Sequence, residues 1–141
     1  MRQIASSLLF GLLLLAPIRA IAGDLTVVIS QVNAQTGSLL AALCVEATYD
    51  DPESCPYTIK TRAKAPSVKI VYVDVTPGTY SVQVFHDEND NGEFDTNLLG
   101  IPKEGVASSN NAHGSFGPPS FLATAFTMNG GNRTLEVKLE Y

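Results

Sequence analysis

The sequence predicts an all-β fold, an antiparallel β-sandwich of about seven strands. Apolar and polar residues alternate with a period of two along much of the chain, as they do on strands that bury one face. Clusters of Gly, Pro, Asn and Asp separate these stretches and predict turns. Of the 141 residues, 45% are hydrophobic and only 16% are charged, which suits one globular domain and excludes a coiled coil.

The first segment, residues 1–22, predicts a secretory signal peptide, which leaves a single domain over residues 23–141. Arg2 supplies the positive start, residues 4–18 are almost all apolar, and the segment ends on Ala-Ile-Ala, a cleavage site of the A-x-A type. A membrane anchor is disfavoured because the apolar stretch is shorter than the roughly 20 residues that a spanning helix needs. We therefore expect a periplasmic or secreted protein without a transmembrane segment in its mature chain.

The first half of the domain holds two predicted strands. Residues 25–30 alternate between Leu, Val or Ile and their neighbours, and a turn follows over residues 33–37. Residues 37–46 predict a second strand, although their Ala and Leu content would also suit a short helix. Residues 49–65 contain Asp-Asp-Pro and Cys-Pro and predict an irregular segment.

The second half predicts two hairpins on either side of a long loop. Residues 68–75 and 79–85 flank a Thr-Pro-Gly turn and predict antiparallel partners. Residues 121–128 and 134–141 flank Asn-Gly-Gly-Asn and predict a second hairpin. Between them, residues 87–117 are polar and show no strand or helix period. A loop of that length in so small a domain is usually functional or ordered by a ligand.

The two cysteines, Cys44 and Cys55, predict a disulfide. An even number of cysteines in an exported chain favours pairing, and two cysteines allow only one pair. The alternative is a redox pair, but the spacing is not that of a C-x-x-C motif. We therefore expect a structural disulfide between the second strand and the irregular segment.

Residues 87–95 carry the pattern D-x-N-x-N-G-x-x-D, which predicts a calcium site. Oxygen-bearing side chains at the first, third and fifth positions converge on one cation if the chain coils tightly, and Gly92 at the sixth permits that turn. All the donors are the hard oxygens that Ca²⁺ prefers. The pattern resembles the first part of an EF-hand loop. The predicted ligands are Asp87, Asn89, Asn91, the backbone carbonyl of Glu93, Asp95 and, from further along the chain, Glu104.

The segment departs from the EF-hand at its twelfth position. Leu98 stands there and cannot supply the bidentate carboxylate of that motif. A later residue must then complete the shell, and Glu104 is the obvious candidate. The alternative interpretation is an Asx-rich turn without a metal, held by bonds from its own side chains to its backbone.

Catalytic motifs are weaker. His86, His113 and a carboxylate such as Glu104 could form a metal site of the His₂-carboxylate type, but their spacing matches no known motif. Gly114-Ser115-Phe116-Gly117 is not a nucleophile elbow, and neither a P-loop nor a dinucleotide fingerprint occurs. We therefore predict a non-catalytic module. The alternative is a small-molecule or glycan binder, or a metal-dependent hydrolase, that uses residues 86–121.

The charge of the chain limits its partners. The formal net charge is −5, and removal of the signal, with its two arginines, makes the protein more acidic. Nucleic-acid binders usually present a basic face, so no nucleic-acid partner is expected. A protein or glycan partner remains open.

A family resemblance covers the mature chain in outline and is dense over residues 77–126. The segments that carry it are Pro77-Gly78-Thr79-Tyr80, His86-Asp87-Glu88-Asn89, Asn91-Gly92, Phe94-Asp95-Thr96-Asn97, Gly100-Ile101-Pro102-Lys103-Glu104-Gly105, Ser109-Asn110-Asn111 and Phe116-Gly117-Pro118-Pro119-Ser120-Phe121. The chain resembles an exported bacterial family, the domain of unknown function numbered 2141. That resemblance implies a bacterial exported protein, Gram-negative in type, with an immunoglobulin- or prealbumin-like sandwich, and it implies no activity or catalytic residue.

Overall fold

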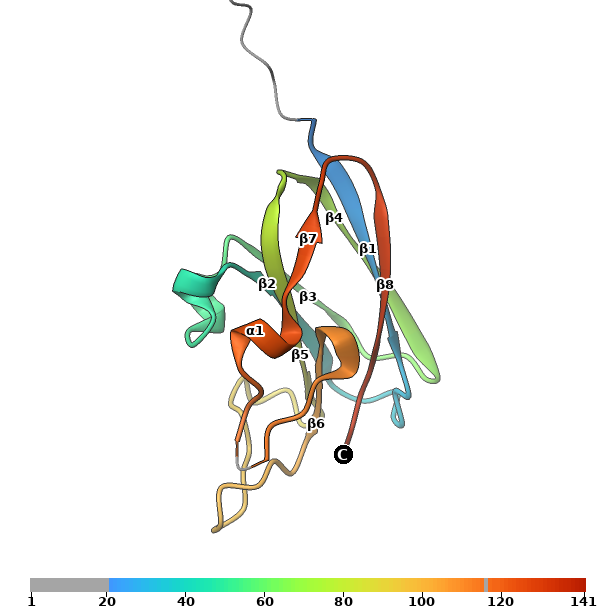
Figure 1. Ribbon diagram of the computed structural model, residues 1–141. Helices are drawn as coiled ribbons and strands as arrows, with labels where there is room; N and C mark the ends of the chain where they lie inside the picture. The colour runs from blue at the N-terminus through green and yellow to red at the C-terminus, as the bar shows by residue number, and fades with distance from the viewer. Residues whose placement is uncertain (1–20, 116) are drawn as a thin grey trace, which may run out of the picture.

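The computed structural model describes residues 21–115 and 117–141, and these form the predicted all-β sandwich (Figure 1). The predicted signal peptide, residues 1–22, lies outside the described residues except for its last two. The strands are β1 (Gly23–Ser30), β2 (Ser38–Cys44), β3 (Tyr57–Arg62), β4 (Ser67–Val75), β5 (Gly78–Asp87), β6 (Gly105–Ser108), β7 (Phe126–Met128) and β8 (Arg133–Lys138), with one helical turn, α1 (Phe121–Thr124), before β7.

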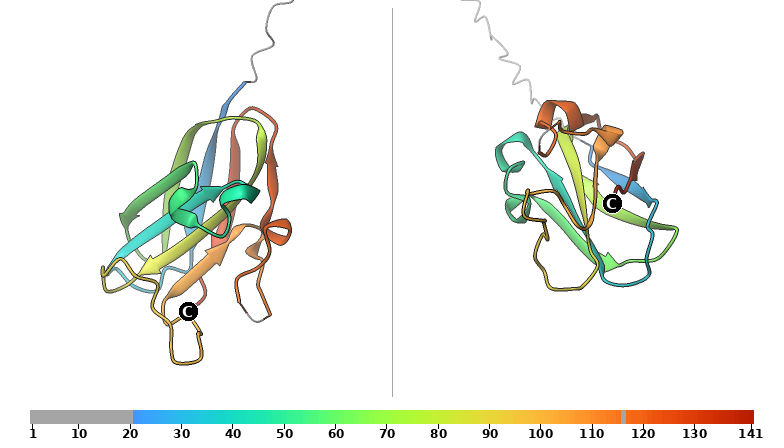
Figure 2. Two further views of the ribbon diagram at one scale, coloured as in Figure 1. Left: turned by 90° about the vertical axis from the view of Figure 1, so that its left-hand side faces the viewer. Right: turned by 90° about the horizontal axis from the view of Figure 1, so that it is seen from below.

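Two sheets face each other. The first has the strand order β4-β1-β8, and the second has the order β3-β2-β5-β6, with β7 paired to the other end of β5. Strand β8 runs parallel to β1, whereas the other pairs are antiparallel. The connections after β5 and β6 extend from the end of the sandwich opposite to the start of β1 (Figures 1 and 2).

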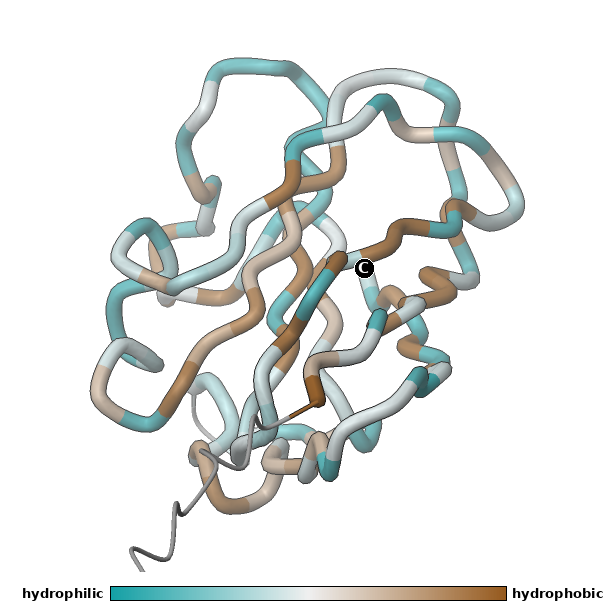
Figure 3. The backbone as a smooth tube through the Cα atoms, turned by 90° about the horizontal axis from the view of Figure 1, so that it is seen from above, coloured by the Kyte–Doolittle hydropathy of each residue, from teal (hydrophilic) through white to brown (hydrophobic). Residues whose placement is uncertain are grey.

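The core lies between the sheets and follows from the period-two pattern. In β1 the predicted core residues Leu25, Val27 and Ile29 are fully buried, while their neighbours are partly exposed. Leu39 and Leu43 of β2 meet them from the second sheet. Figure 3 shows apolar residues recurring along the strands and polar ones filling most connections. Burial of each such side chain contributes about 1.5–3 kcal/mol relative to exposure, which fixes the register of both sheets.

The predicted hairpin of residues 68–75 and 79–85 is wrong. Both strands form, but β4 pairs with β1 in one sheet and β5 pairs with β2 in the other. Thr76 and Pro77 carry the chain across the sandwich. The Tyr80 hydroxyl fastens this crossing because it donates to the Thr76 carbonyl at 3.0 Å. Turn residues predict that the chain reverses direction, but they do not determine whether the two flanking strands pair with each other.

The second predicted hairpin is wrong for the same reason. β7 pairs with β5 and β8 pairs with β1, so the Asn-Gly-Gly-Asn turn also crosses between sheets. The strand predicted over residues 121–128 is shortened by α1, whose first turn Ser120 caps by accepting from the Ala123 N–H at 3.3 Å. Only Phe126–Met128 is extended.

Two strands lie where none was predicted. Residues 49–65 were expected to be irregular, but β3 occupies Tyr57–Arg62 and forms an edge of the second sheet. Within the long polar segment, β6 pairs with the end of β5. Glu140 exchanges two backbone bonds with Val106 of β6, each 2.9 Å long, and so joins the two sheets along one side.

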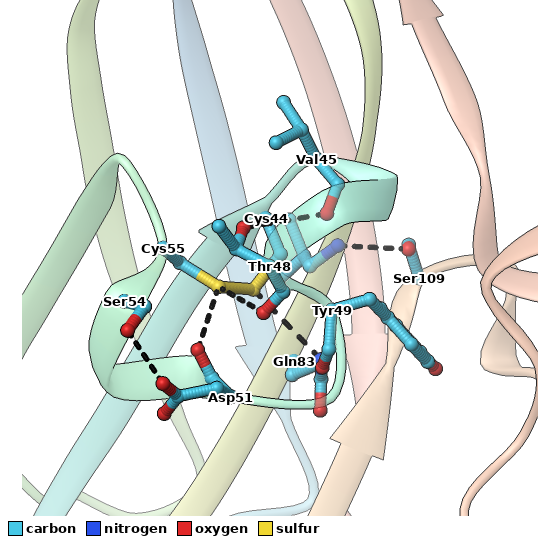
Figure 4. The surroundings of a disulfide bond; sticks show 10 residues. Cys44, Val45, Thr48, Tyr49, Asp51, Ser54, Cys55, Gln83 and Ser109 are labelled. Carbon is cyan, nitrogen blue, oxygen red and sulfur yellow. Dashed lines mark hydrogen bonds between the residues drawn. A yellow bond between two sulfur atoms is a disulfide. The ribbon is translucent and has the colours of Figure 1, made fainter.

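The predicted disulfide is confirmed. Cys44, at the end of β2, is bonded to Cys55, which follows two 3-10 turns (Figure 4). The closed segment places Tyr49 against Phe121, with ring centroids 5.5 Å apart, and the Tyr49 hydroxyl donates to the Pro119 carbonyl at 2.8 Å. The disulfide therefore supports the segment that leads into α1.

No helix among the described residues is long and apolar enough to cross a bilayer.

Candidate functional site

The candidate site is the loop that follows β5, and Asp87 fixes its start. Asp87 is the last residue of β5 and is fully buried. Its two carboxylate oxygens accept the backbone N–H groups of Asn91 at 3.1 Å and Gly92 at 2.9 Å. These bonds coil the chain tightly over five residues. Gly92 has φ +78°, in the left-handed region, which explains why the predicted sharp turn needs glycine at this position.

The two asparagines continue the coil. The side-chain oxygen of Asn89 accepts from the Asn91 N–H at 2.9 Å, and that of Asn91 accepts from the Glu93 N–H at 2.8 Å. Both side-chain amides also donate to one oxygen of Asp95, at 2.8 and 3.2 Å. The third, fifth and ninth positions of the motif therefore meet. An amide oxygen that accepts one N–H retains a second lone pair with which it can contact a cation.

Glu104 closes the loop from outside the motif. It is only 4% exposed, and its carboxylate accepts the Glu88 N–H at 3.0 Å and the Asp95 N–H at 3.2 Å. The structure thus places this carboxylate against the backbone of the second and ninth positions of the loop. Leu98, at the twelfth position, is fully exposed. Glu93 is also exposed, so its side chain is free of the loop interior.

The donor set mixes carboxylates with amides. Within residues 21–115 and 117–141, no group of three or more His, Cys, Asp or Glu side chains is arranged to hold a metal ion by itself. A calcium ion here would therefore also depend on the asparagine and backbone oxygens. Ca²⁺ accepts such mixed oxygen shells of six to eight ligands, whereas Zn²⁺ favours nitrogen and sulfur.

Sequence reasoning missed the residues that anchor the loop to the sheet. The Ser38 hydroxyl donates to the Asp90 carboxylate at 2.6 Å, and the Lys60 ammonium lies 3.9 Å from the same oxygen. Asp90 has φ +56°, which directs it away from the regular chain path. Ser38 and Lys60 lie on neighbouring strands far from the loop in sequence, so no local pattern could have indicated these contacts.

The histidine site is not supported. His86 is fully buried, and its ring nitrogens contact the Tyr141 hydroxyl at 2.8 Å and the Thr36 carbonyl at 2.9 Å. Because the carbonyl can only accept, Nε2 carries a proton and donates it to Thr36. His113 is exposed and lies 3.0 Å from Glu140. The structure gives these histidines and Glu104 separate partners, so the three do not form one site.

A groove of about 1310 Å³ lies beside the loop, on the outer face of the second sheet. The part of the loop between Asp95 and Glu104 forms one of its walls. Phe94 packs edge to face against Phe85 of β5, with ring centroids 5.3 Å apart. Phe94 therefore places an apolar ring within the segment that the sequence predicts to be polar.

Comparisons with known proteins identify a family. Residues 27–136 match the model of DUF2141, described as an uncharacterized protein conserved in bacteria. No curated protein and no solved structure matches the chain. The match covers most of the chain, so the chain belongs to this family, and the predicted resemblance is confirmed.

Proposed function

We propose that this DUF2141 member is an exported, non-catalytic β-sandwich module whose loop over residues 87–104 binds one Ca²⁺ and which acts in binding or in envelope structure. One observation carries the proposal. Asp87, Asn89, Asn91 and Asp95 form a single coiled loop, and the buried carboxylate of Glu104 is bonded to its backbone. A buried carboxylate at this place would supply the charged oxygen that the motif lacks at its twelfth position.

Electrostatics supports a cation in this loop. Asp87 and Glu104 are both buried, and Asp95 is nearby, so three carboxylates are held around one short segment. The three carboxylates carry the same charge, and a divalent cation bound by the loop would offset that charge. Ca²⁺ suits the loop better than Mg²⁺, since Mg²⁺ requires near-octahedral geometry and sheds its water reluctantly.

Export is the second part of the proposal. It rests on the signal-like residues 1–22 and is supported by the Cys44–Cys55 disulfide, since such bonds persist in oxidising compartments. The family is bacterial, so the expected location is the periplasm or the medium.

The test of calcium binding is the melting temperature in millimolar Ca²⁺ and in excess chelator. Binding to the folded state alone stabilises it by about 2.7 kcal/mol at one hundred times the dissociation constant, which corresponds to several degrees in this size range. Asp87→Ala and Asp95→Ala should abolish the calcium-dependent shift. Glu88→Ala is the matched control, because Glu88 gives only its backbone N–H to the loop. Identical curves for the wild type in both conditions would reduce the motif to an Asx-rich turn.

A small-molecule binder is the second candidate, and the groove beside the loop favours it. The hydrolase form of this alternative loses support, because His86, Glu104 and His113 have separate partners.

A further inference from the structure

The groove on the outer face of the second sheet offers a site whose chemistry can be stated. We propose that it binds an uncharged, mainly apolar small molecule, such as a long-chain alcohol or an isoprenoid. This inference deepens the proposed binding role and rests on it, but it requires no calcium.

The floor of the groove carries apolar side chains beside polar ones, of which Gln83 and Ser108 also line it. Leu40 and Ala42 of β2 alternate with core residues and therefore face outward, although Ala42 is only 6% exposed because it packs in the small cluster around the disulfide. Phe85 of β5 and Val106 of β6 face the same side, and all four line the groove. An outer sheet face normally carries polar side chains, so these four apolar positions indicate a surface that an apolar ligand could cover.

The walls continue the apolar surface. Phe94, Leu99 and Ile101 line the groove from the loop, and all three are more than half exposed to solvent. Asn97 holds the turn that presents them, because its side-chain oxygen accepts the N–H groups of Leu99 at 2.8 Å and Ile101 at 3.0 Å. Pro118 contributes to the lining from the connection before α1. The backbone of the turn is therefore held in place, while its apolar side chains remain exposed to solvent.

The charges around the groove point to an uncharged ligand. Its lining contains two lysines, Lys60 and Lys138, and two glutamates, Glu53 and Glu140, so their charges balance. Lys60 also lies near Asp90, and Glu140 lies 3.0 Å from His113. A carboxylate or phosphate headgroup would find no excess of positive charge. Gln83, Ser108 and Asn111 also line the groove and can bind a hydroxyl group, but the exposed apolar side chains of the walls favour an apolar body over a glycan.

Backbone pairing closes the two central floor strands to the addition of a peptide strand. The floor strands β2 and β5 each have hydrogen-bonded neighbours on both sides, so an extended peptide cannot add to them as a further strand. The volume of about 1310 Å³ is ample for a whole small molecule, since ligand pockets typically measure about 300–1,000 Å³.

The test is saturable binding of the uncharged fluorophore N-phenyl-1-naphthylamine to the full-length mature protein. We expect one site per chain and displacement by hexadecanol, with much weaker displacement by palmitate or by a soluble oligosaccharide. Absence of saturable binding would overturn the proposal. Displacement by palmitate or the oligosaccharide at lower concentration than hexadecanol would overturn the assignment of an uncharged ligand.

Neighbouring leucines give a matched pair of variants. Leu98 and Leu99 lie on the same turn and are both exposed, but only Leu99 lines the groove. Leu99→Asp should weaken probe binding about tenfold, while Leu98→Asp leaves it unchanged. Equal effects of the two would contradict binding in the groove. The calcium-dependent melting shift is measured separately, so failure of calcium binding and failure of the groove are distinguishable.

Discussion

Replacing Glu104 by Gln separates a structural role of this carboxylate from a role in binding calcium. The side chain is buried and accepts two backbone N–H groups, from Glu88 and Asp95. Gln keeps the shape but offers one acceptor oxygen, so its amide N–H₂ would face one of these N–H donors. One bond to a charged acceptor is lost and one buried N–H is left unpaired, which should cost about 3 kcal/mol of unfolding free energy in chelator.

Calcium should widen the difference between the two proteins. The wild type gains about 2.7 kcal/mol from Ca²⁺ at one hundred times the dissociation constant, and the variant should lose most of this gain. The difference in unfolding free energy would then rise from about 3 kcal/mol in chelator to between about 5 and 6 kcal/mol in calcium.

Urea unfolding followed by circular dichroism measures both values, and the absence of tryptophan makes intrinsic fluorescence a poorer probe. Glu93→Gln is the matched control, since it removes the same charge from an exposed side chain of the same loop. An equal loss for Glu104→Gln in calcium and in chelator would show that Glu104 only supports the backbone.

Three other perturbations test separate parts of the structure. Replacing Cys44 and Cys55 together with Ala should lower the unfolding free energy by about 3 kcal/mol, because the disulfide closes a loop with a sequence separation of 11 residues. The calcium-dependent shift in melting temperature should persist in this variant. Urea titration of both forms checks the loss of stability, and an unchanged unfolding midpoint would refute it. The Tyr72 hydroxyl is buried and has no hydrogen-bond partner within the described part of the chain, so Tyr72→Phe should raise stability by about 1 kcal/mol at pH 7. Burial also raises the pKa of Tyr72, so above pH 10 the folded state keeps the hydroxyl proton while the unfolded state loses it. The unfolding free energy should therefore fall as the pH rises above about 10, by up to about 1.4 kcal/mol per pH unit. In thermal melts, Tyr72→Phe should reduce that fall. Finally, Ca²⁺ should tighten naphthylamine binding severalfold, because Asp95 and Glu104 flank the turn that forms one wall of the groove. Equal affinities for the probe in calcium and in chelator would show that the two sites are independent.

Local sequence patterns predicted much of the fold, because the alternation of apolar and polar residues reflects which side chains of a strand are buried. The alternation in β1 and β4 and the turn residues depend on neighbours in sequence, whereas the disulfide was predicted from the number of cysteines in an exported chain. The pairing of strands was not predictable in this way. β4 and β5 flank a good turn, yet burial of both strands against opposite sheets outweighs their pairing with each other. The short strand β6 depends on Glu140 and β5 for its bonds, and no periodicity over four residues reveals that.

The candidate site shows the same division. The coil that starts at Asp87 was predictable because the side-chain oxygens of Asp87 and Asn89 accept backbone N–H groups two to five residues away. Glu104 was predicted from the chemistry that a calcium shell requires, and the structure places it beside the loop. The bond between Ser38 and Asp90 spans 52 residues, and only the folded sheet brings these groups together.

Direct measurement of bound calcium tests the central claim. Protein stripped with chelator is dialysed against micromolar to millimolar Ca²⁺ and analysed for metal content, with Asp95→Ala, which removes a predicted ligand, as the reference. The proposal predicts saturation at one ion per wild-type chain, with a dissociation constant in the range of extracellular calcium modules, about 10⁻⁴–10⁻³ M. It predicts no saturable uptake of calcium by the variant. Wild-type protein that holds no more calcium than Asp95→Ala at every concentration would contradict it.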